Sequence, residues 1–408
     1  MSSGNMPRAQ HPALFHWDDG LDPGNYVRAR YRVTSIHDGE ATAMAMAMEQ
    51  SCATTVIAGH VVPDMLGHAT IRVLDVTSAG TLPDSELRPY QLETEVYADH
   101  GGRERDWVVE LAIPRHLLAG KPAQLLNVVV GELPRLGFLT RFQLQGMDVP
   151  DDFGPGPAFG VKGIRRHFRR ETGPLLCRSM RPAVGLDIPT MAGLHRDVLV
   201  GGFHLVKDDE LQVFADNEVF RKHVQAMVAA RDEARDLTGE FKGYLANLIC
   251  EPWELAERWD ILDEHGVDAA LVAPAIQGLG VLPMLGRQAR RPLLAHNSFS
   301  DLLTRHLRWG IAHGVLEDWM ACLGADWYVT AGDRGQAEGV APATALGHAT
   351  RAMPILQGGK HPRGLADYRA SVGSDDYMLI VASWVDAHPD GLEAGARIFR
   401  EAVDAQSG

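Results

Sequence analysis

The second part of the chain alternates between short apolar runs and longer amphipathic stretches. The apolar runs are bounded by glycine, proline or charged residues, a pattern that predicts buried strands. Strands are expected at Pro174–Met180, Leu199–Lys207, Tyr244–Ile249, Ala269–Ala273, Pro292–His296, Asp326–Thr330, Met353–Gln357 and Tyr377–Ser383. Helices are expected at Val161–Arg170, Glu218–Thr238, Pro252–His265, Ser298–Gly314, Ala341–Ala352, Leu365–Ser371 and Gly391–Ala405. This alternation predicts a (β/α)8 TIM barrel, whose active site lies at the C-terminal ends of its strands.

The first part of the chain has a different pattern, with several strand-like segments and few helices. Strands are expected at Tyr26–Ile36, Ala69–Asp75, Tyr90–Ala98, Trp107–Pro114, Leu125–Gly131 and Arg141–Val149. Glu40–Gln50 is rich in alanine and methionine and predicts a helix. The mixture predicts an α+β (ferredoxin-like) N-terminal domain over residues 1–155, followed by the barrel domain over 156–408. The boundary is expected in the Gly/Pro-rich segment Asp151–Gly160.

The most informative strand end is that of Leu199–Lys207, where an apolar run stops at one lysine and three carboxylates. Side chains alternate along a strand, so Lys207 and Asp209 are expected on one face, with Glu210 beside them. A carbamate formed from Lys207 and CO2 would add a third oxygen ligand to the two carboxylates. Such a set suits Mg2+. For an isolated run a solvated acidic turn is the simpler interpretation, but other predicted strands also end in polar residues, which favours a site.

Composition narrows the possible functions. The 408 residues are 45% apolar and carry a formal net charge of −14, and we find no long basic stripe, so nucleic acid is not an expected partner. No run of about 18 apolar residues occurs, so no membrane span is expected. The four cysteines are far apart, and the N-terminal residues lack an apolar signal core. We therefore expect a cytoplasmic protein.

Several segments resemble the large chain of ribulose-1,5-bisphosphate carboxylase (RuBisCO), and more closely its non-carboxylating relatives, the RuBisCO-like proteins. The segments are DGLDPGNYVRARYRV (19–33), TGPLLCRSMRPAVGLD (172–187), GGFHLVKDDE (201–210), QGGKH (357–361) and AHPDGLEAGARIFREA (387–402). Together they span nearly the whole chain in the order of the family. The Lys-x-Asp-Glu strand end is the most specific of these motifs.

The resemblance implies a role for each matching residue. Lys207 would be the carbamylated lysine, Asp209 and Glu210 the Mg2+ ligands, and Arg181 and His296 further catalytic residues. The implied substrate-binding residues are Arg181, His296, Asn297, Gln357, Gly358, Gly359, Lys360 and Ser383, with Glu49 and Thr54 reaching in from the neighbouring subunit. Such a shared site implies a homodimer or a higher homo-oligomer of dimers.

The departures from the family pattern argue against CO2 fixation. Arg181 and Ala183 stand where the carboxylases have lysines, and residues 331–336 contain no lysine. Arginine stays protonated, so it can bind an anion but transfers protons poorly. Trp384 replaces part of a glycine turn and is expected to close a second phosphate site. We expect an Mg2+-dependent lyase or isomerase that forms or uses an enolate of a small sugar-acid or keto-sugar (phosphate) substrate, by enolisation, isomerisation or decarboxylation.

Two alternatives remain open at this point. The first is sulfur salvage, in which a diketo-methylthiopentyl phosphate is enolised and Met284 and Trp384 contact the thioether. The second is a non-catalytic scaffold that has kept the fold. The intact Lys207, Asp209 and Glu210 set favours an enzyme over the scaffold.

Overall fold

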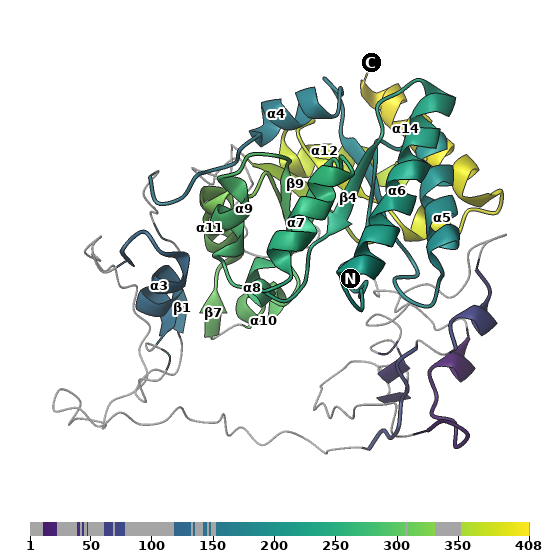
Figure 1. The fold of residues 1–408 in the computed structure, drawn as a ribbon, viewed down its shortest axis with the longest axis horizontal. Coiled ribbons are helices and arrows are strands. Elements are labelled where there is room, and N and C mark those ends of the chain that lie inside the picture. The colour runs from purple at the N-terminus through teal and green to yellow at the C-terminus, as the bar shows by residue number, and fades with distance from the viewer. Residues whose placement is uncertain are drawn as a thin grey trace.

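The computed structural model describes residues 11–22, 61–67, 70–77, 118–131, 142–144, 152–306, 309–330 and 352–407, together with positions 39, 40, 43, 44, 47, 134 and 147. Within these residues, a closed barrel of parallel strands dominates the fold (Figure 1). The strands are, in barrel order, β10 (Met378–Ile380), β2 (Leu175–Ser179), β3 (Leu205–Lys207), β4 (Gly243–Asn247), β5 (Ala269–Val272), β6 (Leu293–Ala295), β8 (Trp327–Val329) and β9 (Met353–Leu356). The predicted TIM barrel is confirmed.

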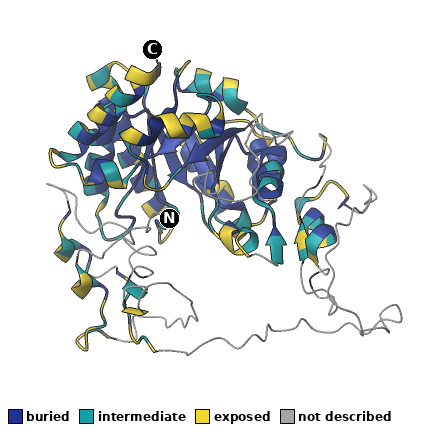
Figure 2. Ribbon diagram, turned by 180° about the vertical axis from the view of Figure 1, so that it is seen from behind, coloured by how far each residue is buried: buried dark blue, intermediate teal, exposed yellow. Residues whose placement is uncertain are grey.

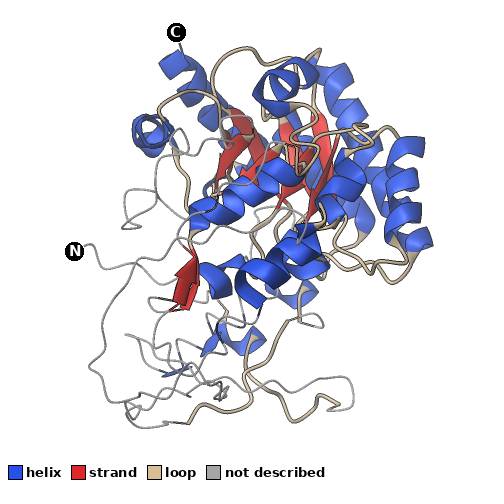
Figure 3. Cartoon of the chain, turned by 90° about the vertical axis from the view of Figure 1, so that its left-hand side faces the viewer, coloured by secondary structure: helices blue, strands red, loops and turns tan. Residues whose placement is uncertain are grey.

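Helices surround the barrel, as Figure 3 shows for the strands in red and the helices in blue. They are α4 (Gly160–His167), α5 (Ile188–Val200), α6 (Asn217–Thr238), α7 (Leu255–Glu264), α8 (Pro274–Gln277), α9 (Val281–Gly286), α10 (Ser300–Thr304), α11 (His313–Leu323), α12 (Leu365–Val372), α13 (Ser383–Asp386) and α14 (Gly391–Ser407). For two of the longer helices, an aspartate just before the first turn fixes where the helix begins. Asp187 and Asp216 accept hydrogen bonds from the first turns of α5 and α6.

The core has two layers, which Figure 2 shows as the dark blue centre of the molecule. Inward-facing residues of the strands, such as Leu175, Cys177 and Leu205, fill the barrel interior. Ile164 and Phe168, from α4 and the residue after it, pack into the same cluster and close the N-terminal end of the barrel. The larger layer lies between the strands and the outer helices. The C-terminal ends of the strands are therefore left for a site.

Short segments before residue 152 lie against the barrel. Strand β1 (Phe142–Leu144) pairs in parallel with β7 (Trp309–Ile311). The 3-10 helix η3 (Pro63–Met65) precedes Leu66, which is fully buried. A side chain at Gly185, in the loop after β2, would approach Leu66 to 3.0 Å, so the two segments are in close contact. These described pieces connect the first part of the chain to the loops at the C-terminal end of the barrel.

Three predicted elements differ from the structure. Residues 125–131, predicted as a strand, are helical, with α3 (Pro122–Leu126) followed by a π-helical turn, η5 (Asn127–Gly131). The predicted strand Leu199–Lys207 is α5 at its start and a strand only from Leu205. The predicted helix Ser298–Gly314 is interrupted by β7 and continues as α11. Short apolar runs are compatible with either a helix or a strand, and the structure decides by long-range pairing and burial.

The structure describes some other predicted elements only in part, and others not at all. Within Ala69–Asp75, described residues show an isolated bridge from Val73 to His16 and no longer ladder. The described positions of Glu40–Gln50 are helical. Tyr26–Ile36, Tyr90–Ala98 and Trp107–Pro114 lie outside the described residues, as do Glu49, Thr54 and all of the predicted helix Ala341–Ala352 except Ala352. In the described part of the chain, every helix is too short or too polar to cross a membrane.

Candidate active site

The end of β3 places a lysine and two carboxylates in one small volume. Lys207 is the last residue of the strand and is 1% exposed. Its Nζ donates to Glu210 Oε2 at 2.9 Å and to the carbonyl oxygen of Asp208 at 3.0 Å. Leu205 lies in the barrel interior, so alternation directs Lys207 inward above it. The lysine side chain is thus held at the C-terminal mouth of the barrel beside Glu210.

Asp209 joins this group through the neighbouring strand. Ser179, the last residue of β2, donates its hydroxyl to Asp209 Oδ2 at 3.1 Å. Arg181, two residues further on, places its Nε 2.9 Å from the same oxygen. The backbone N–H of Leu211 donates to Oδ1 at 3.0 Å. Asp209 is fully buried and held from three directions.

Arg181 touches both carboxylates. Besides its contact with Asp209, its Nη2 lies 3.8 Å from Glu210 Oε1. The arginine side chain is 16% exposed, so it occupies the wall of the site with limited access to water. The structure therefore places Arg181 with Lys207, Asp209 and Glu210, as the predicted strand ends required.

His296 follows β6 and faces the same group, with Nε2 3.4 Å from Glu210 Oε2. The backbone N–H of Ser298 points at His296 Nδ1 at 3.2 Å. An amide can only donate, so Nδ1 accepts and the neutral ring carries its proton on Nε2. Burial, assisted by the charges of Lys207 and Arg181 and opposed by Glu210, lowers the pKa of His296 to about 4. Near neutral pH the ring is an uncharged donor directed toward Glu210.

The two carboxylates differ in their electrostatics. Burial alone would raise the pKa of Glu210, but Lys207, His296 and Arg181 outweigh it and hold that pKa below its ordinary value. Burial, followed by the charge of Glu210, raises the pKa of Asp209 against the opposing effects of Arg181 and Lys207. Paired positive charges thus stabilise Glu210 as the more acidic of the two groups.

A second polar cluster lies behind the strand end, on the helix side. Asp208 is fully buried and accepts from Tyr244 Oη at 2.6 Å and from the backbone N–H of Asn247 at 3.1 Å. His223 of α6 places Nε2 2.8 Å from the other oxygen of Asp208. Asn247 Nδ2 also donates to the carbonyl oxygen of Asp209 at 3.0 Å. These contacts fix the backbone that carries the site.

Sequence reasoning did not identify the residues of this cluster, or Ser179. For Ser179 a signal was available, because it lies two residues after the inward-facing Cys177 on β2. For His223 and Tyr244 no local pattern distinguishes a buried partner of Asp208 from any other polar residue in a helix or strand. Only the packing of α6 against β4 brings them together.

The loop after β9 forms another part of the site. Gln357 Nε2 contacts Asn297 Oδ1 at 3.4 Å, which joins this loop to the end of β6. Gly358 and Gly359 have φ angles of +77° and +57°, and the space beside each Cα is open. Both conformations favour glycine. Two exposed backbone amides beside open space are a feature that anion sites use.

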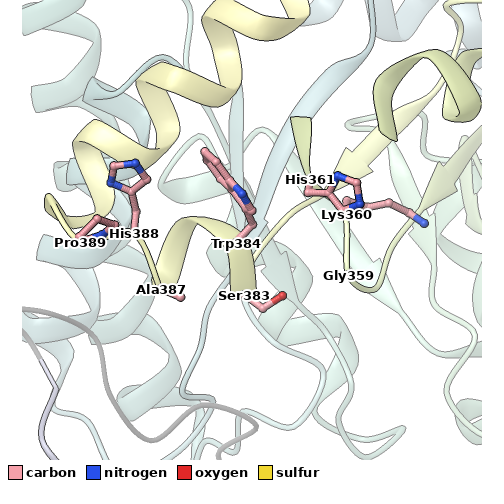
Figure 4. A pocket seen from close by; sticks show the side chains of 8 residues that line it. All are labelled: Gly359, Lys360, His361, Ser383, Trp384, Ala387, His388 and Pro389. Atoms are coloured by element: carbon pink, nitrogen blue, oxygen red, sulfur yellow. The ribbon is translucent and has the colours of Figure 1, made fainter. Parts of the chain in front are cut away.

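A cavity of about 380 Å³ lies between this loop and α13 (Figure 4). It is lined by Gly359, Lys360, His361, Ser383, Trp384, Ala387, His388 and Pro389. Lys360 is buried, with Nζ 4.7 Å from the centre of the Tyr368 ring. The predicted residues Gly359, Lys360 and Ser383 therefore share one cavity.

Trp384 does not cover Ser383. Its indole points toward α14 (Figure 4) and packs edge-on against Phe399, with ring centres 5.6 Å apart. Ser383 is exposed and lines the cavity. Met284, the other residue considered for a thioether, lies on α9 and is not among the lining residues. The apolar wall of this cavity therefore comes from Trp384, Ala387 and Pro389.

The residues at the end of β3 fit a hard divalent cation. The nearby donors, Asp209 and Glu210, are carboxylate oxygens of the kind that Mg2+ binds. Within the described residues, no three His, Cys, Asp or Glu side chains come together as a metal-binding group. A third protein oxygen at this place would have to come from Lys207 as a carbamate, and its Nζ lies within 2.9 Å of Glu210.

Comparison with known proteins identifies the relatives of this chain. Residues 160–341 match the family model described as the ribulose bisphosphate carboxylase large chain, catalytic domain. A 2,3-diketo-5-methylthiopentyl-1-phosphate enolase of Geobacillus thermodenitrificans is 30% identical over 312 residues, covering 73% of this chain and 75% of the relative. A RuBisCO-like protein of Chlorobaculum tepidum is 27% identical over 404 residues, covering 95% of this chain and 90% of the relative.

Solved structures show the same fold. A RuBisCO-like protein from Alicyclobacillus acidocaldarius superposes with a TM-score of 0.65 at 29% identity, covering 72% of this chain and 76% of that one. A RuBisCO from Hyperthermus butylicus, described as dimeric, has a TM-score of 0.63 at 24% identity, covering 70% of this chain and 73% of that one.

Proposed function

Because the chain belongs to the RuBisCO large-chain family as a RuBisCO-like protein, we propose that it is a Mg2+-dependent enzyme of the enolase type. Its substrate would be a small keto-sugar or sugar acid, with or without phosphate. The family generally uses Mg2+ with a carbamylated lysine. The observation that carries the proposal is the group formed by the buried Lys207 and Asp209 with the partly buried Glu210 at the mouth of the barrel.

The chemistry follows from the groups present. A bound Mg2+ would stabilise negative charge that develops on a substrate oxygen. Lys207, as a carbamate, would remove a proton from the carbon beside the substrate carbonyl. His296, with its proton on Nε2, would donate a hydrogen bond to a substrate oxygen near Glu210. Arg181 would hold a carboxylate of the substrate, since its guanidinium binds anions in a planar fork.

The loop after β9 supplies the anion-binding part of the proposal. Gly358 and Gly359 offer backbone amides, and Ser383 faces the neighbouring cavity, which Lys360 also lines while its Nζ lies over the Tyr368 ring. Gln357 and Asn297, which contact each other, would orient substrate hydroxyl groups between the cavity and His296. A phosphate in the cavity would thus lie at one end of the substrate and the enolising carbon at the other.

Carboxylation is not part of the proposal. Arg181 takes the place of a lysine that the carboxylases use, and it pairs with Asp209. Arginine cannot deliver and accept protons at neutral pH. Ala183 is buried beside it and carries no titratable group. Residues 331–336, which lack lysine in the sequence, lie outside the described residues.

Sulfur salvage is the second candidate. Two relatives are named 2,3-diketo-5-methylthiopentyl-1-phosphate enolases. The specific observation in its favour is the cavity beside Gly359, whose wall includes Trp384, Ala387 and Pro389. A thioether would pack against such a wall. The alternative is a non-catalytic scaffold, which measurements of Mg2+ binding and of proton exchange on a substrate must exclude.

We also propose that the active form is a homodimer or a larger assembly of dimers. Exposed apolar side chains follow four neighbouring strands at the mouth of the barrel; they are Val213, Trp253, Ile276, Phe299 and Leu302. Large exposed apolar groups around a site mark an interface. The dimeric Hyperthermus butylicus protein shares this fold. The occupant we propose is the first part of a second copy, including Glu49 and Thr54.

A metal-binding and exchange experiment tests the proposed reaction. Mg2+ should bind more tightly when bicarbonate is present, and Lys207→Ala should abolish this dependence, whereas Lys222→Ala, which changes an exposed lysine of α6, should not. In D2O, wild-type protein should exchange the proton beside the carbonyl of a keto-sugar monophosphate, followed by NMR. With ribulose 1,5-bisphosphate, labelled CO2 should not enter 3-phosphoglycerate.

The outcomes separate the candidates. Bicarbonate-independent Mg2+ binding, unchanged in Lys207→Ala, would remove the carbamate from the mechanism. Metal binding without exchange on any keto acid or keto-sugar would favour the scaffold. Exchange confined to a methylthio-substituted diketone phosphate would select sulfur salvage over sugar-acid chemistry.

A further inference from the structure

Asp209 Oδ2 is already fully engaged by protein groups. It accepts from the Ser179 hydroxyl at 3.1 Å and lies 2.9 Å from Arg181 Nε. A carboxylate oxygen offers about two lone-pair positions. Both positions of Oδ2 are therefore used by Ser179 and Arg181, and Oδ1 accepts from the backbone N–H of Leu211. Coordination of a cation through Oδ2 requires Arg181 to leave that oxygen.

We propose that Arg181 couples metal binding to the binding of an anionic substrate. Without the substrate anion, Arg181 competes with the cation for Asp209. When the substrate arrives, its carboxylate takes the guanidinium, and Oδ2 of Asp209 becomes available as a ligand atom. The inference rests on the proposed function for the identity of the site, but it concerns the order and cooperativity of binding, which the proposed reaction leaves undetermined.

Burial explains why Arg181 needs another anion once it leaves Asp209. Its side chain is only 16% exposed, and its other carboxylate contact, Glu210 Oε1, lies at 3.8 Å. A desolvated cation that loses a carboxylate partner is unfavourable. A carboxylate matches the guanidinium fork with two parallel hydrogen bonds, whereas a hydroxyl does not. The substrate class that relieves Arg181 is therefore a carboxylic acid or another planar oxyanion.

Charge balance points the same way. With Lys207 as an amine, Lys207 and Arg181 neutralise Asp209 and Glu210. With Lys207 as a carbamate, the three anionic groups exceed the charge of one Mg2+ by one negative charge. The positive charge of Arg181 then keeps the site neutral, so the arginine stays within the site, because its movement to bulk water would leave one negative charge uncompensated.

The coupling is reciprocal. If a carboxylate ligand tightens Mg2+ binding by some factor, Mg2+ tightens binding of the ligand by the same factor, typically about 5- to 150-fold between coupled sites. Replacing Arg181 by glutamine removes the competitor and the receptor for the anion together. It should therefore tighten Mg2+ binding in the absence of ligand and remove most of the coupling.

The experiment is a calorimetric titration of the full chain with Mg2+ in bicarbonate buffer. Each titration is run alone, with glycerate, and with glycerol, which lacks the carboxylate. The proteins compared are wild type, Arg181→Gln, Arg181→Lys, and Arg369→Gln. The last removes one positive charge from α12, where Arg369 is 54% exposed and pairs with Asp375, so it controls for net charge.

We expect glycerate, and not glycerol, to tighten Mg2+ binding to wild type and Arg369→Gln by about 5-fold or more. In Arg181→Gln, Mg2+ alone should bind more tightly and the effect of glycerate should fall to that of direct chelation. Arg181→Lys should keep the competition but lose part of the glycerate effect. Equal Mg2+ affinity in wild type and Arg181→Gln, or an undiminished glycerate effect in the variant, would overturn the inference while leaving the proposed function standing. Absence of Mg2+ binding in all the proteins would overturn both.

Discussion

Arg178 and Ser179 are consecutive residues of β2 that face opposite sides of the barrel wall. Ser179 reaches Asp209 in the site, whereas Arg178 points to the helix side and pairs with Asp386 at 2.9 Å, with both side chains buried. Burial raises the pKa of Asp386, and Arg178 acts against that rise. Arg178 also donates to the carbonyl oxygen of Arg181 at 2.8 Å. The pair therefore anchors the backbone that carries Arg181.

Breaking this pair on one side should be costly. Arg178→Met would leave the buried Asp386 without its cation, and we expect a loss of about 3–5 kcal/mol in the free energy of unfolding, measured in urea. Arg178→Met combined with Asp386→Leu replaces both charges by apolar groups and should recover most of the loss. If the effects of the two substitutions on the free energy of unfolding simply added, the ion pair would not be the source of the loss.

At the scale of elements, α5 links the site to the outer layer of helices. It begins at Ile188, directly after the loop that holds Arg181, and contacts α6 and α14. Asp187 accepts from the backbone N–H of Thr190 at 2.8 Å and so closes the first turn. Hydrogen bonds from Thr190 lower the pKa of Asp187 below its ordinary value. The cap is thus strongest when Asp187 is ionised.

Removing the cap should weaken α5 in a pH-dependent manner. Asp187→Ala should cost about 1 kcal/mol of unfolding free energy at pH 7. A lowered folded-state pKa contributes stability above the ordinary carboxyl pKa, and that contribution is lost as pH falls through the folded pKa. The gap between wild type and Asp187→Ala should therefore narrow in acid. Asp187→Asn, which keeps a hydrogen-bond acceptor, is the control. If the difference in unfolding free energy between wild type and Asp187→Ala did not change with pH, ionised Asp187 would not be the cap of α5.

At the scale of the whole molecule, the apolar side chains at the barrel mouth are the clearest sign of assembly. Trp253 and Leu302 are 80% and 73% exposed, and they follow β4 and β6. The C-terminal ends of parallel strands lie on one face, so these side chains lie on the same face as the site. A second copy would cover both the apolar rim and the substrate.

Light scattering can test this arrangement. Wild type should have twice the 44.5 kDa chain mass or an even multiple of it, and Trp253→Asp or Leu302→Asp should shift it toward the monomer, because a charge buried in an apolar interface is unfavourable. Leu237→Asp is the matched control, since Leu237 is 65% exposed but lies at the far end of α6. A wild-type monomer with undiminished activity at micromolar concentration would rule out a shared site.

Much of the barrel could be predicted from the sequence because each strand is a short apolar run with clear boundaries. The predicted ends carrying Arg181, Lys207, His296 and Gln357 all lie at the C-terminal side of the confirmed barrel. Prediction was wrong where an apolar run was compatible with both structures. Leu199 and Val200 end α5 instead of starting β3, and β7 forms by pairing with β1, which is distant in the sequence.

The sequence by itself determined which residues stand at strand ends and which faces they take, because alternation along a strand is local. It could not determine which groups meet. Arg181 reaches Asp209, and His296 reaches Glu210, because β2, β3 and β6 are brought around one closed barrel in a fixed register. Likewise, His223 meets Asp208 only when α6 packs on the strands. Local pattern places the chemical groups on the strands; closure of the barrel decides their partners.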